Sequence, residues 1–356
     1  MFPHTKSTKS PSRVWLRKRR GCGLAGIVAA SANILVGSMV SSQDVEMAYR
    51  LILGREPESA SAVAFHCSRW ESLRALREAF LESAEFRNLT SRVVQTDADY
   101  NPPLAVETEL TLAELQQMLE RVEQCWSALG RTEPYWSVAS FDRFKSGTFD
   151  AHASQFYASG EREVKRMLAW LRRNHIDPST IGSCCEYGCG VGRVTPWLCS
   201  QFARVFACDV SEPHLELARR HLLAQGHSNV VFQKIDSLVS PEQFGHVDLL
   251  FSIIVLQHNP PPVIAHIVRT LLRSLNPGGL AFFQVPTYAA GYGFNAKEYL
   301  RRPVNEAAFE MHLLPQSVIF RIVRDEGCSI LEVQPDTYVG SPQWISNTFL
   351  IQRRTP

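Results

Sequence analysis

The chain has 356 residues, which is long enough for two domains or for one domain with a substantial appendage. Its formal net charge is only +2 and its composition is ordinary for a globular protein, so no strong electrostatic field favours nucleic acid as a partner. The nine cysteines form no C-x-x-C pair. This pattern argues against a metal site and favours reduced, mostly buried thiols in a cytoplasmic protein.

The first forty residues combine a basic cluster with an apolar run. Seven Lys and Arg residues lie within the first 20 positions, and residues 21–40 are uncharged and mostly apolar. The pattern resembles a secretion signal or a short membrane anchor, although glycine, serine and asparagine make the run weakly apolar for a membrane span. Met39 stands just before the first clear helical pattern. We rank an over-long start or disordered tail over residues 1–38 first, a membrane anchor second and a cleaved signal third.

Residues 41–90 are predicted to form a small all-α module. Apolar side chains recur at helical spacing in two runs, and Gly54 with Pro57 ends the first run. The stretches AYRLILGREPES and LREAFLESAEFR resemble a helical module related to phycobilisome linker repeats, which accompanies bacterial glycosyltransferases and methyltransferases. The resemblance implies that this module docks a partner and carries no chemistry of its own.

Residues 91–155 are predicted to be a linker followed by a helix that leads into a lid. Asn101-Pro102-Pro103 punctuates the linker. The capping box Thr111–Glu114 opens a helix that Gly130 closes. An aromatic-rich segment, EPYWSVASFDRF, then precedes the last predicted domain, residues 156–356.

From residue 183 onward, short apolar runs alternate with helical patterns. Strands are expected in SCCEYG, ARVFACDVS, NVVFQKID, HVDLLFSII and NPGGLAFFQVP, with a helix after each of the first, second and fourth. The tail adds a helix in PQSVIFRIVRDEG and strands in SILEVQ and SNTFLIQR. The β-α-β-α order predicts an α/β fold, in which a parallel sheet carries helices on both faces.

The stretch EYGCGVGR, residues 186–193, places three glycines between the first of these strands and its helix. Main chain without side chains can approach a ligand closely there. The G-x-G-x-G spacing departs from the G-x-G-x-x-G fingerprint of dinucleotide sites, and the loop lacks the Gly-Lys-Ser/Thr end of a Walker loop. The carboxylate of Glu186 suits a cationic ligand better than a pyrophosphate. A nicotinamide dehydrogenase is therefore disfavoured.

Carboxylates also end the next two predicted strands, at Asp209 and Asp236. If the cationic ligand contains a nucleoside, Asp209 is suited to accept hydrogen bonds from its two ribose hydroxyls, and Asp236 to accept one from its adenine amino group. Together EYGCGVGR, CDVS, KID, VDLLFSIIVLQH and LNPGGLAFFQVP resemble the class I S-adenosylmethionine-dependent methyltransferases over residues 156–352. The resemblance implies a Rossmann-like sheet of seven strands, the last of them antiparallel.

The same resemblance places S-adenosyl-L-methionine against the strand ends and the segment before the sheet. The implied contacts are Tyr157, Gly160, Glu186, Gly188, Cys189, Gly190, Asp209, Val210, Asp236, Ser237, Ser252 and Ile253. Tyr157 and Gly160 are expected to fold over the cofactor, and Cys189 to be a small residue of the loop. The alternative for any single carboxylate is an exposed cap of the next helix, but three at successive strand ends favour a ligand.

His258, in IVLQHNPPP, follows the fourth strand at the face where the methyl group is expected. A hydroxyl acceptor must lose a proton, and histidine titrates near neutrality, so His258 is the candidate base. The alternative is that His258 shapes the loop or contacts the cofactor. Four weaker candidates for the acceptor pocket, for which core packing is an equal alternative, are Tyr288, Tyr292, His312 and Trp344.

Asn259-Pro260-Pro261 resembles part of the Asn/Asp-Pro-Pro-aromatic motif of amino-methyltransferases. Pro262 stands at the aromatic position and the motif comes several residues late, so we interpret it as a loop that starts the next helix. The prediction is a cytoplasmic methyltransferase acting on an oxygen of a small molecule, a sugar, or a glycan- or lipid-linked acceptor. Transfer to nitrogen or to a protein stays open, as does a non-catalytic scaffold that binds the cofactor.

Overall fold

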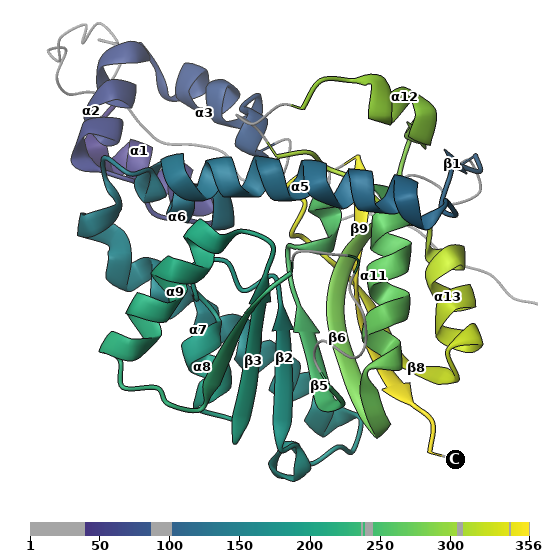
Figure 1. Cartoon of the computed structure of the whole chain (residues 1–356). Helices are drawn as coiled ribbons and strands as arrows, with labels where there is room; N and C mark the ends of the chain where they lie inside the picture. The colour runs from purple at the N-terminus through teal and green to yellow at the C-terminus, as the bar shows by residue number, and fades with distance from the viewer. Residues whose placement is uncertain are drawn as a thin grey trace, which may run out of the picture. The chain divides into compact units, whose positions relative to one another are not determined.

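The computed structural model describes residues 40–86, 102–235, 238, 245–304, 309–341 and 343–355. The chain divides into two compact units, Met1–Arg87 and Asn88–Pro356 (Figure 1). Most of the apolar run predicted as a possible anchor therefore lies outside the described residues. Within the described ranges, the helices are all too short or too polar to cross a membrane.

The first unit is helical, in line with its sequence pattern. It contains α1 (Ser42–Ala48), the π-helical turn η1 (Tyr49–Leu53), α2 (Ala60–Arg69) and α3 (Leu73–Leu81). A serine caps the N-terminus of each α-helix by accepting a hydrogen bond from a backbone N–H of the first turn. A small apolar core holds the unit together, and its buried side chains are Val40, Val45, Tyr49, Leu53, Val63, Leu76 and Phe80.

The second unit is built on a seven-stranded sheet with the order β4-β3-β2-β5-β6-β9-β8. The first five strands in chain order are mutually parallel, and β9 runs antiparallel to both of its neighbours. The predicted α/β fold and antiparallel last strand are confirmed. The strands are β2 (Ser183–Tyr187), β3 (Arg204–Asp209), β4 (Val230–Lys234), β5 (Val247–Ser252), β6 (Leu275–Ala289), β8 (Cys328–Asp336) and β9 (Trp344–Arg353).

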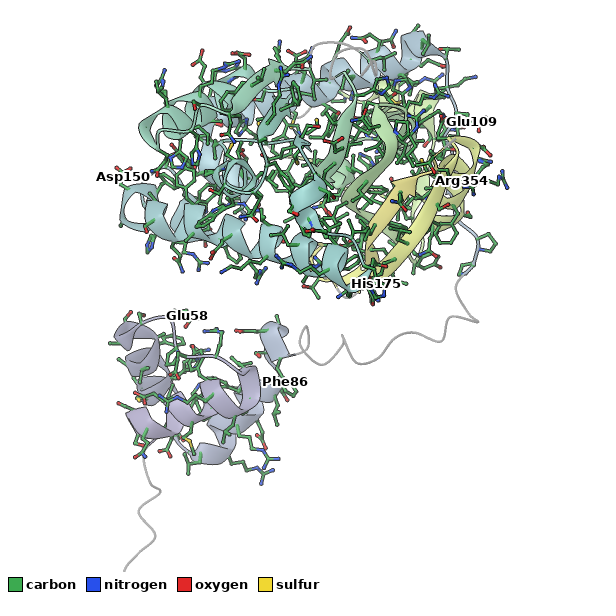
Figure 2. The ribbon with its side chains drawn as sticks, turned by 90° about the horizontal axis from the view of Figure 1, so that it is seen from below. Glu58, Phe86, Glu109, Asp150, His175 and Arg354 are labelled. Atoms are coloured by element: carbon green, nitrogen blue, oxygen red, sulfur yellow. The ribbon has the colours of Figure 1, made fainter. Side chains whose placement is uncertain are left out.

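Helices cover both faces of this sheet. Met118 of α5 (Leu112–Thr132), Ile264 of α11 (Pro261–Arg273) and Ile319 of α13 (Gln316–Asp325) join one buried cluster. Met167 of α7 (Ala153–Arg173) and Leu198 of α8 (Thr195–Cys199) join the other. In Figure 2, α7 runs between the labelled Asp150 and His175 and covers one face. Successive strand residues alternate between the two clusters because strand side chains point alternately to opposite faces.

The remaining elements lie mostly before the sheet or beside its last strands. They are β1 (Ala105–Val106), α6 (Pro134–Val138), η3 (Asp142–Phe144), η4 (Phe149–His152), η5 (Pro178–Thr180), α9 (Glu212–Ala224), η6 (Leu256–His258), β7 (Gly293–Phe294) and α12 (Ala296–Arg301). β1 and β7 form a short parallel ladder of their own. The region predicted as a linker and helix, 91–155, belongs to the same compact unit as the sheet. Its long helix α5 crosses above the ends of the central strands (Figure 1).

Candidate functional site

A pocket lies where the carboxyl ends of β2, β3 and β5 meet, beneath α5 and α6. It holds about 830 Å³ of space, part of it open to solvent. Eight residues predicted from the sequence line it: Glu186, Gly188, Cys189, Gly190, Asp209, Val210, Ile253 and His258. In open parallel sheets, ligands bind at this edge where the strand order reverses, and here β2 is the strand at which it reverses.

The backbone of the loop after β2 requires glycine at all three glycine positions, and the first two of these line the pocket. Gly188 has φ +80° and Gly190 has φ +54°, both in the left-handed region that other residues avoid. A Cβ on Gly188 would come within 2.4 Å of the Val255 side chain, and one on Gly190 within 2.8 Å of Val138. The loop therefore exposes bare main chain to the pocket, beneath α6.

Glu186 ends β2 as a buried carboxyl group in the pocket wall. Its Oε2 accepts a hydrogen bond of 2.6 Å from the hydroxyl of Thr195. Burial raises the pKa of Glu186 to about 8, although the hydrogen bond from Thr195 and the charge of Arg193 oppose the shift. The group is therefore largely protonated at neutral pH, and a cationic ligand would convert it to the carboxylate.

Arg193 follows the glycine loop and also lines the pocket. Its Nη1 donates to the Ser159 hydroxyl at 3.2 Å, but its buried Nε has no hydrogen-bond partner among the described residues. Burial lowers the pKa of the guanidinium, while the carboxyl groups of Glu163 and Glu186 oppose that shift. A buried donor without a partner is costly, and an anionic ligand group would satisfy it. Arg193 directly follows the glycines of EYGCGVGR, but no role was predicted for it from the sequence.

Asp209 ends β3 with both carboxylate oxygens anchored to main chain. Oδ2 accepts from the Gly190 N–H at 2.8 Å, and Oδ1 accepts from the Ser211 N–H at 2.9 Å. Each oxygen keeps acceptor capacity for a ligand hydroxyl. Asp209 thus connects two adjacent strand ends and holds the glycine loop, in addition to lining the pocket.

Three predicted contacts lie away from the pocket lining. Tyr157 stacks on the His221 ring, with 3.5 Å between ring centroids. Gly160 allows α7 to pack against the glycine loop, because a Cβ there would meet the Arg193 carbonyl oxygen at 2.1 Å. Ser252 donates to the Tyr187 carbonyl at 3.0 Å and ties β5 to β2. Asp236 and Ser237 lie outside the described residues, so their roles stay predictions.

His258 also lines the pocket, beside two aromatic rings. The centroid of its ring is 5.2 Å from that of Trp126 and 4.9 Å from that of Phe309. Its Nδ1 is 2.9 Å from the Glu310 carbonyl oxygen, which can only accept. Burial lowers the pKa of His258 to about 4, so the imidazole is neutral at physiological pH.

The loop after His258 follows the interpretation made from the sequence. The Asn259 side-chain amide donates to the Val255 carbonyl at 3.1 Å, and Pro261 opens α11. The weaker candidates lie elsewhere: His312 bridges the Tyr292 hydroxyl and the Glu310 carboxylate at 2.8 and 3.0 Å, outside the pocket lining. The other two candidates, Tyr288 and Trp344, are also absent from that lining.

Several lining residues were not assigned from the sequence, among them four of those that come from helices. Trp126 comes from α5, Ser137 and Val138 come from α6, and His214 comes from α9. The Ser137 hydroxyl lies 3.0 Å from Nε2 of His214, which ties α6 to α9 above the pocket. For Ser137 and Val138, the only signal in the sequence was the aromatic-rich segment at residues 133–144, whose lack of period did not show which side chains turn inward.

Known proteins are similar to the part of the chain that carries this pocket. A family model described as a methyltransferase domain matches residues 185–279. A ubiquinone biosynthesis O-methyltransferase of Pseudomonas fluorescens (strain Pf0-1) is 32% identical over 188 residues, which cover 50% of this chain and 75% of the relative. One of Nitrosospira multiformis is 28% identical, with 42% of this chain and 63% of the relative covered. The chain thus spans somewhat less than two thirds of the length of that second relative.

Among solved structures, magnesium protoporphyrin IX methyltransferase from Synechocystis with bound S-adenosylhomocysteine is 19% identical, with a TM-score of 0.42. The match covers 61% of this chain and 99% of that one. The strand order, the strand-end carboxylates, the matched domain and the relative from Pseudomonas fluorescens agree with one another. The chain belongs to the S-adenosylmethionine-dependent methyltransferases.

Proposed function

We propose that this protein transfers a methyl group from S-adenosylmethionine to a hydroxyl oxygen of a small, largely uncharged molecule. The observation that carries the proposal is that two kinds of side chain line one pocket, and we call these two sets its charged end and its neutral end. Glu186, Arg193 and Asp209 line the charged end, and His258 with Trp126 lines the neutral end. The oxygen acceptor is further supported by the relatives, whose names describe O-methyltransferases.

The charged end fits the cofactor by charge and by shape. The amino-acid part of S-adenosylmethionine carries an ammonium and a carboxylate, which match the buried Glu186 and the unpartnered Nε of Arg193. Asp209 would accept from ribose hydroxyls, as the sequence predicts. Gly188 and Gly190 both line the pocket, and with no side chains of their own they leave their main chain open to a ligand.

The cofactor supplies an electrophilic methyl group when it is bound. The protein's own part is to position the acceptor hydroxyl, to exclude water and to take up the hydroxyl proton. α5 and α6 cover the pocket through Trp126, Ser137 and Val138. We assign proton uptake to Nε2 of His258. Its low pKa keeps Nε2 unprotonated throughout the physiological range, at the cost of a weaker base. The Gln257 amide nitrogen lies 3.3 Å from this Nε2, so the acceptor hydroxyl would have to displace that contact.

The neutral end favours an apolar or ring-shaped acceptor over a sugar or a glycan. Trp126 packs beside His258, and the described lining also contains the apolar Val122, Ile254 and Val255. The amide of Asn259 is already bonded to main chain. A sugar would require several free polar groups around it. Flat apolar molecules can stack on Trp126 and place one hydroxyl at the imidazole.

The test is methyl transfer with matched acceptors. The full chain would be incubated with methyl-labelled S-adenosylmethionine and pairs of ring compounds that differ only in hydroxyl or amino group, together with simple sugars. We expect label on the hydroxyl compounds alone. Label on the amino compounds alone would replace the proposal with N-methylation. Cofactor binding by calorimetry without transfer to any compound or cell-extract component would favour the scaffold alternative.

Two further predictions from the sequence stay proposals. The helical module, residues 41–90, is proposed to dock a partner, and the protein is proposed to act in the cytoplasm. Removal of that module should leave methyl transfer to a small acceptor unchanged, because each lining residue of the described pocket lies in the second unit.

A further inference from the structure

We propose that Gln257 and Gln284 form a buried amide relay, which holds His258 with its proton on Nδ1 and its lone pair on Nε2. The consequence for turnover rests on the proposed function, in which Nε2 takes up the hydroxyl proton. The ring state itself is a property of the folded chain and can be measured without cofactor or acceptor.

The relay starts at a backbone N–H. The Ile254 N–H donates to Oε1 of Gln284 at 3.0 Å, and a backbone N–H can only donate. This contact decides which end of the Gln284 amide is oxygen. The amide nitrogen must then face the other way, where it donates to Oε1 of Gln257 at 3.0 Å and to the Ser346 hydroxyl at 2.7 Å.

The second amide transmits this orientation to the histidine. Because Oε1 of Gln257 accepts from Gln284, its amide nitrogen faces His258, 3.3 Å from Nε2. An amide nitrogen donates and does not accept, so Nε2 must offer its lone pair. The same amide nitrogen also lies 3.6 Å from the Met311 sulfur.

The contact on the opposite side of the His258 ring indicates the same position of the proton independently. The Glu310 carbonyl oxygen lies 2.9 Å from Nδ1, so Nδ1 must carry the proton. The His312 N–H donates to the Gln257 carbonyl at 2.7 Å and holds this segment beside the relay. If either amide were rotated, or the ring proton moved to Nε2, two donors or two acceptors would face each other in a buried region. Unsatisfied polar groups are costly there.

The relay is buried throughout and begins at a strained residue. Gln284 has no exposed surface, and Gln257 and His258 are 3% and 7% exposed. Ile254 has φ +62°, a left-handed conformation that is rare for a β-branched side chain. A strained backbone conformation persists only where the surrounding structure stabilises it. The hydrogen bond from the Ile254 N–H to Gln284 is one of the contacts that stabilise it here. The same relay thus ties the lining residue Ile254 to His258.

The first measurement is the ring state of His258 in the unmodified full chain. Imidazole nitrogen and carbon chemical shifts, assigned with a His258→Gln variant, distinguish a proton on Nδ1 from one on Nε2. We expect the Nδ1–H form at pH 7 in the absence of cofactor. A ring protonated on Nε2 alone, or a mixture of both forms, would overturn the proposal, whatever the methyl-transfer assay gives.

The second measurement reverses the relay. Gln257→Glu keeps the side-chain shape but places a carboxylate at Nε2, so we expect Nε2 to become protonated at pH 7. Turnover should fall by about 100-fold, within the range of general-base effects, while the affinity for S-adenosylmethionine stays within about twofold. Gln284→Glu should act in the same direction, because its second oxygen forces the Gln257 amide to turn.

Ser346→Ala is the matched control. It removes a buried hydrogen bond to Gln284 but leaves the contact between Ile254 and Gln284, so the amide keeps its orientation. We expect the Nδ1–H form and near-normal turnover. If Gln257→Glu moved the proton and left turnover unchanged, these glutamines would not be positioning residues. If the unmodified chain had the Nδ1–H ring but methylated no hydroxyl, the proposed function would fail and the ring assignment would stand.

Discussion

The two ends of the pocket are built in different ways. The charged end comes mostly from one short stretch, residues 186–210, in which strand ends and the glycine loop follow each other closely. The neutral end is assembled from side chains far apart in the chain, including Trp126, His258 and Phe309. In the proposed function, the first recognises a ligand by formal charge and the second depends on the orientation of an uncharged imidazole. We therefore expect changes at the first to affect mainly binding and changes at the second to affect mainly turnover.

The largest effect is expected at the glycine loop, where binding depends on main-chain shape. Gly188→Val would force a branched side chain into a position with φ +80° and against Val255. We expect a loss of about 3 kcal/mol in the free energy of unfolding and no measurable cofactor binding. Chemical denaturation measures the free energy of unfolding, and calorimetry measures cofactor binding. Gly147→Val is the control, since its Cβ would meet nothing within 4 Å. Intact binding in Gly188→Val would contradict the account of the loop.

His258→Ala tests the neutral end by itself. We expect cofactor affinity to stay within about threefold, and turnover to fall by about 100-fold to 10,000-fold, because a positioned base is lost. Single-turnover kinetics with labelled cofactor would measure this. His246→Ala, at an exposed position, is the control. Unchanged turnover would remove His258 as proton acceptor and leave it the role of shaping the pocket, the alternative noted from the sequence.

Arg193→Met tests the charged end. The substitution removes the guanidinium proposed to hold the ligand carboxylate and keeps most of the side-chain volume. We expect cofactor affinity to fall by about 10-fold to 100-fold, the range for a lost hydrogen bond to a charged group. Stability without ligand should change little or rise, since the orphaned Nε disappears. Arg162→Met, whose parent side chain is 83% exposed, is the control. If Arg193→Met lowered turnover but left cofactor affinity unchanged, Arg193 would not be the group that holds the ligand carboxylate.

The smallest effect is a pH dependence of cofactor binding. With the pKa of Glu186 raised to about 8, the group is protonated below that pH and must release its proton to pair with a cation. Affinity should therefore rise with pH by up to about tenfold per unit until about pH 8, and then level off. Calorimetry in buffers of different ionisation enthalpy would detect one released proton at pH 7. The Glu186→Gln variant should bind the cofactor weakly, and its affinity should not rise with pH. If the rise with pH persisted in this variant, another titrating group would cause it.

The stability of the ligand-free protein should show the opposite trend from the same group. The pKa of Glu186 is higher in the folded state than its ordinary value of 4.5. The folded protein therefore binds more protons than the unfolded chain across the interval between 4.5 and about 8. Its contribution to stability is fully present below that interval and is lost as the pH rises through it. Denaturation curves at pH 5 and pH 8 for the unmodified chain and Glu186→Gln isolate this contribution.

Local patterns were enough to predict the sheet and much of the charged end. The helical spacing in α5, α7 and α11 and the glycines of the loop are properties of neighbouring residues, and the structure follows them closely. The contacts proposed for Tyr157 and Gly160 illustrate the limit. Both residues belong to α7, and their surroundings depend on how that helix packs against His221 and the glycine loop. Spacing along a helix does not reveal which partner it meets.

The amino-acid sequence by itself determined the order of strands and helices, the open main chain at Gly188 and Gly190, and the carboxylates at the strand ends. Propensity, period and the absence of a side chain act over a few residues. Only the tertiary structure decided that Arg193 has an unpartnered nitrogen among the described residues, that Trp126 packs beside His258, and that the Gln257 amide next to His258 is bonded to the distant Gln284. Hydrogen-bond direction and burial are decided by partners that the chain brings together only when it folds.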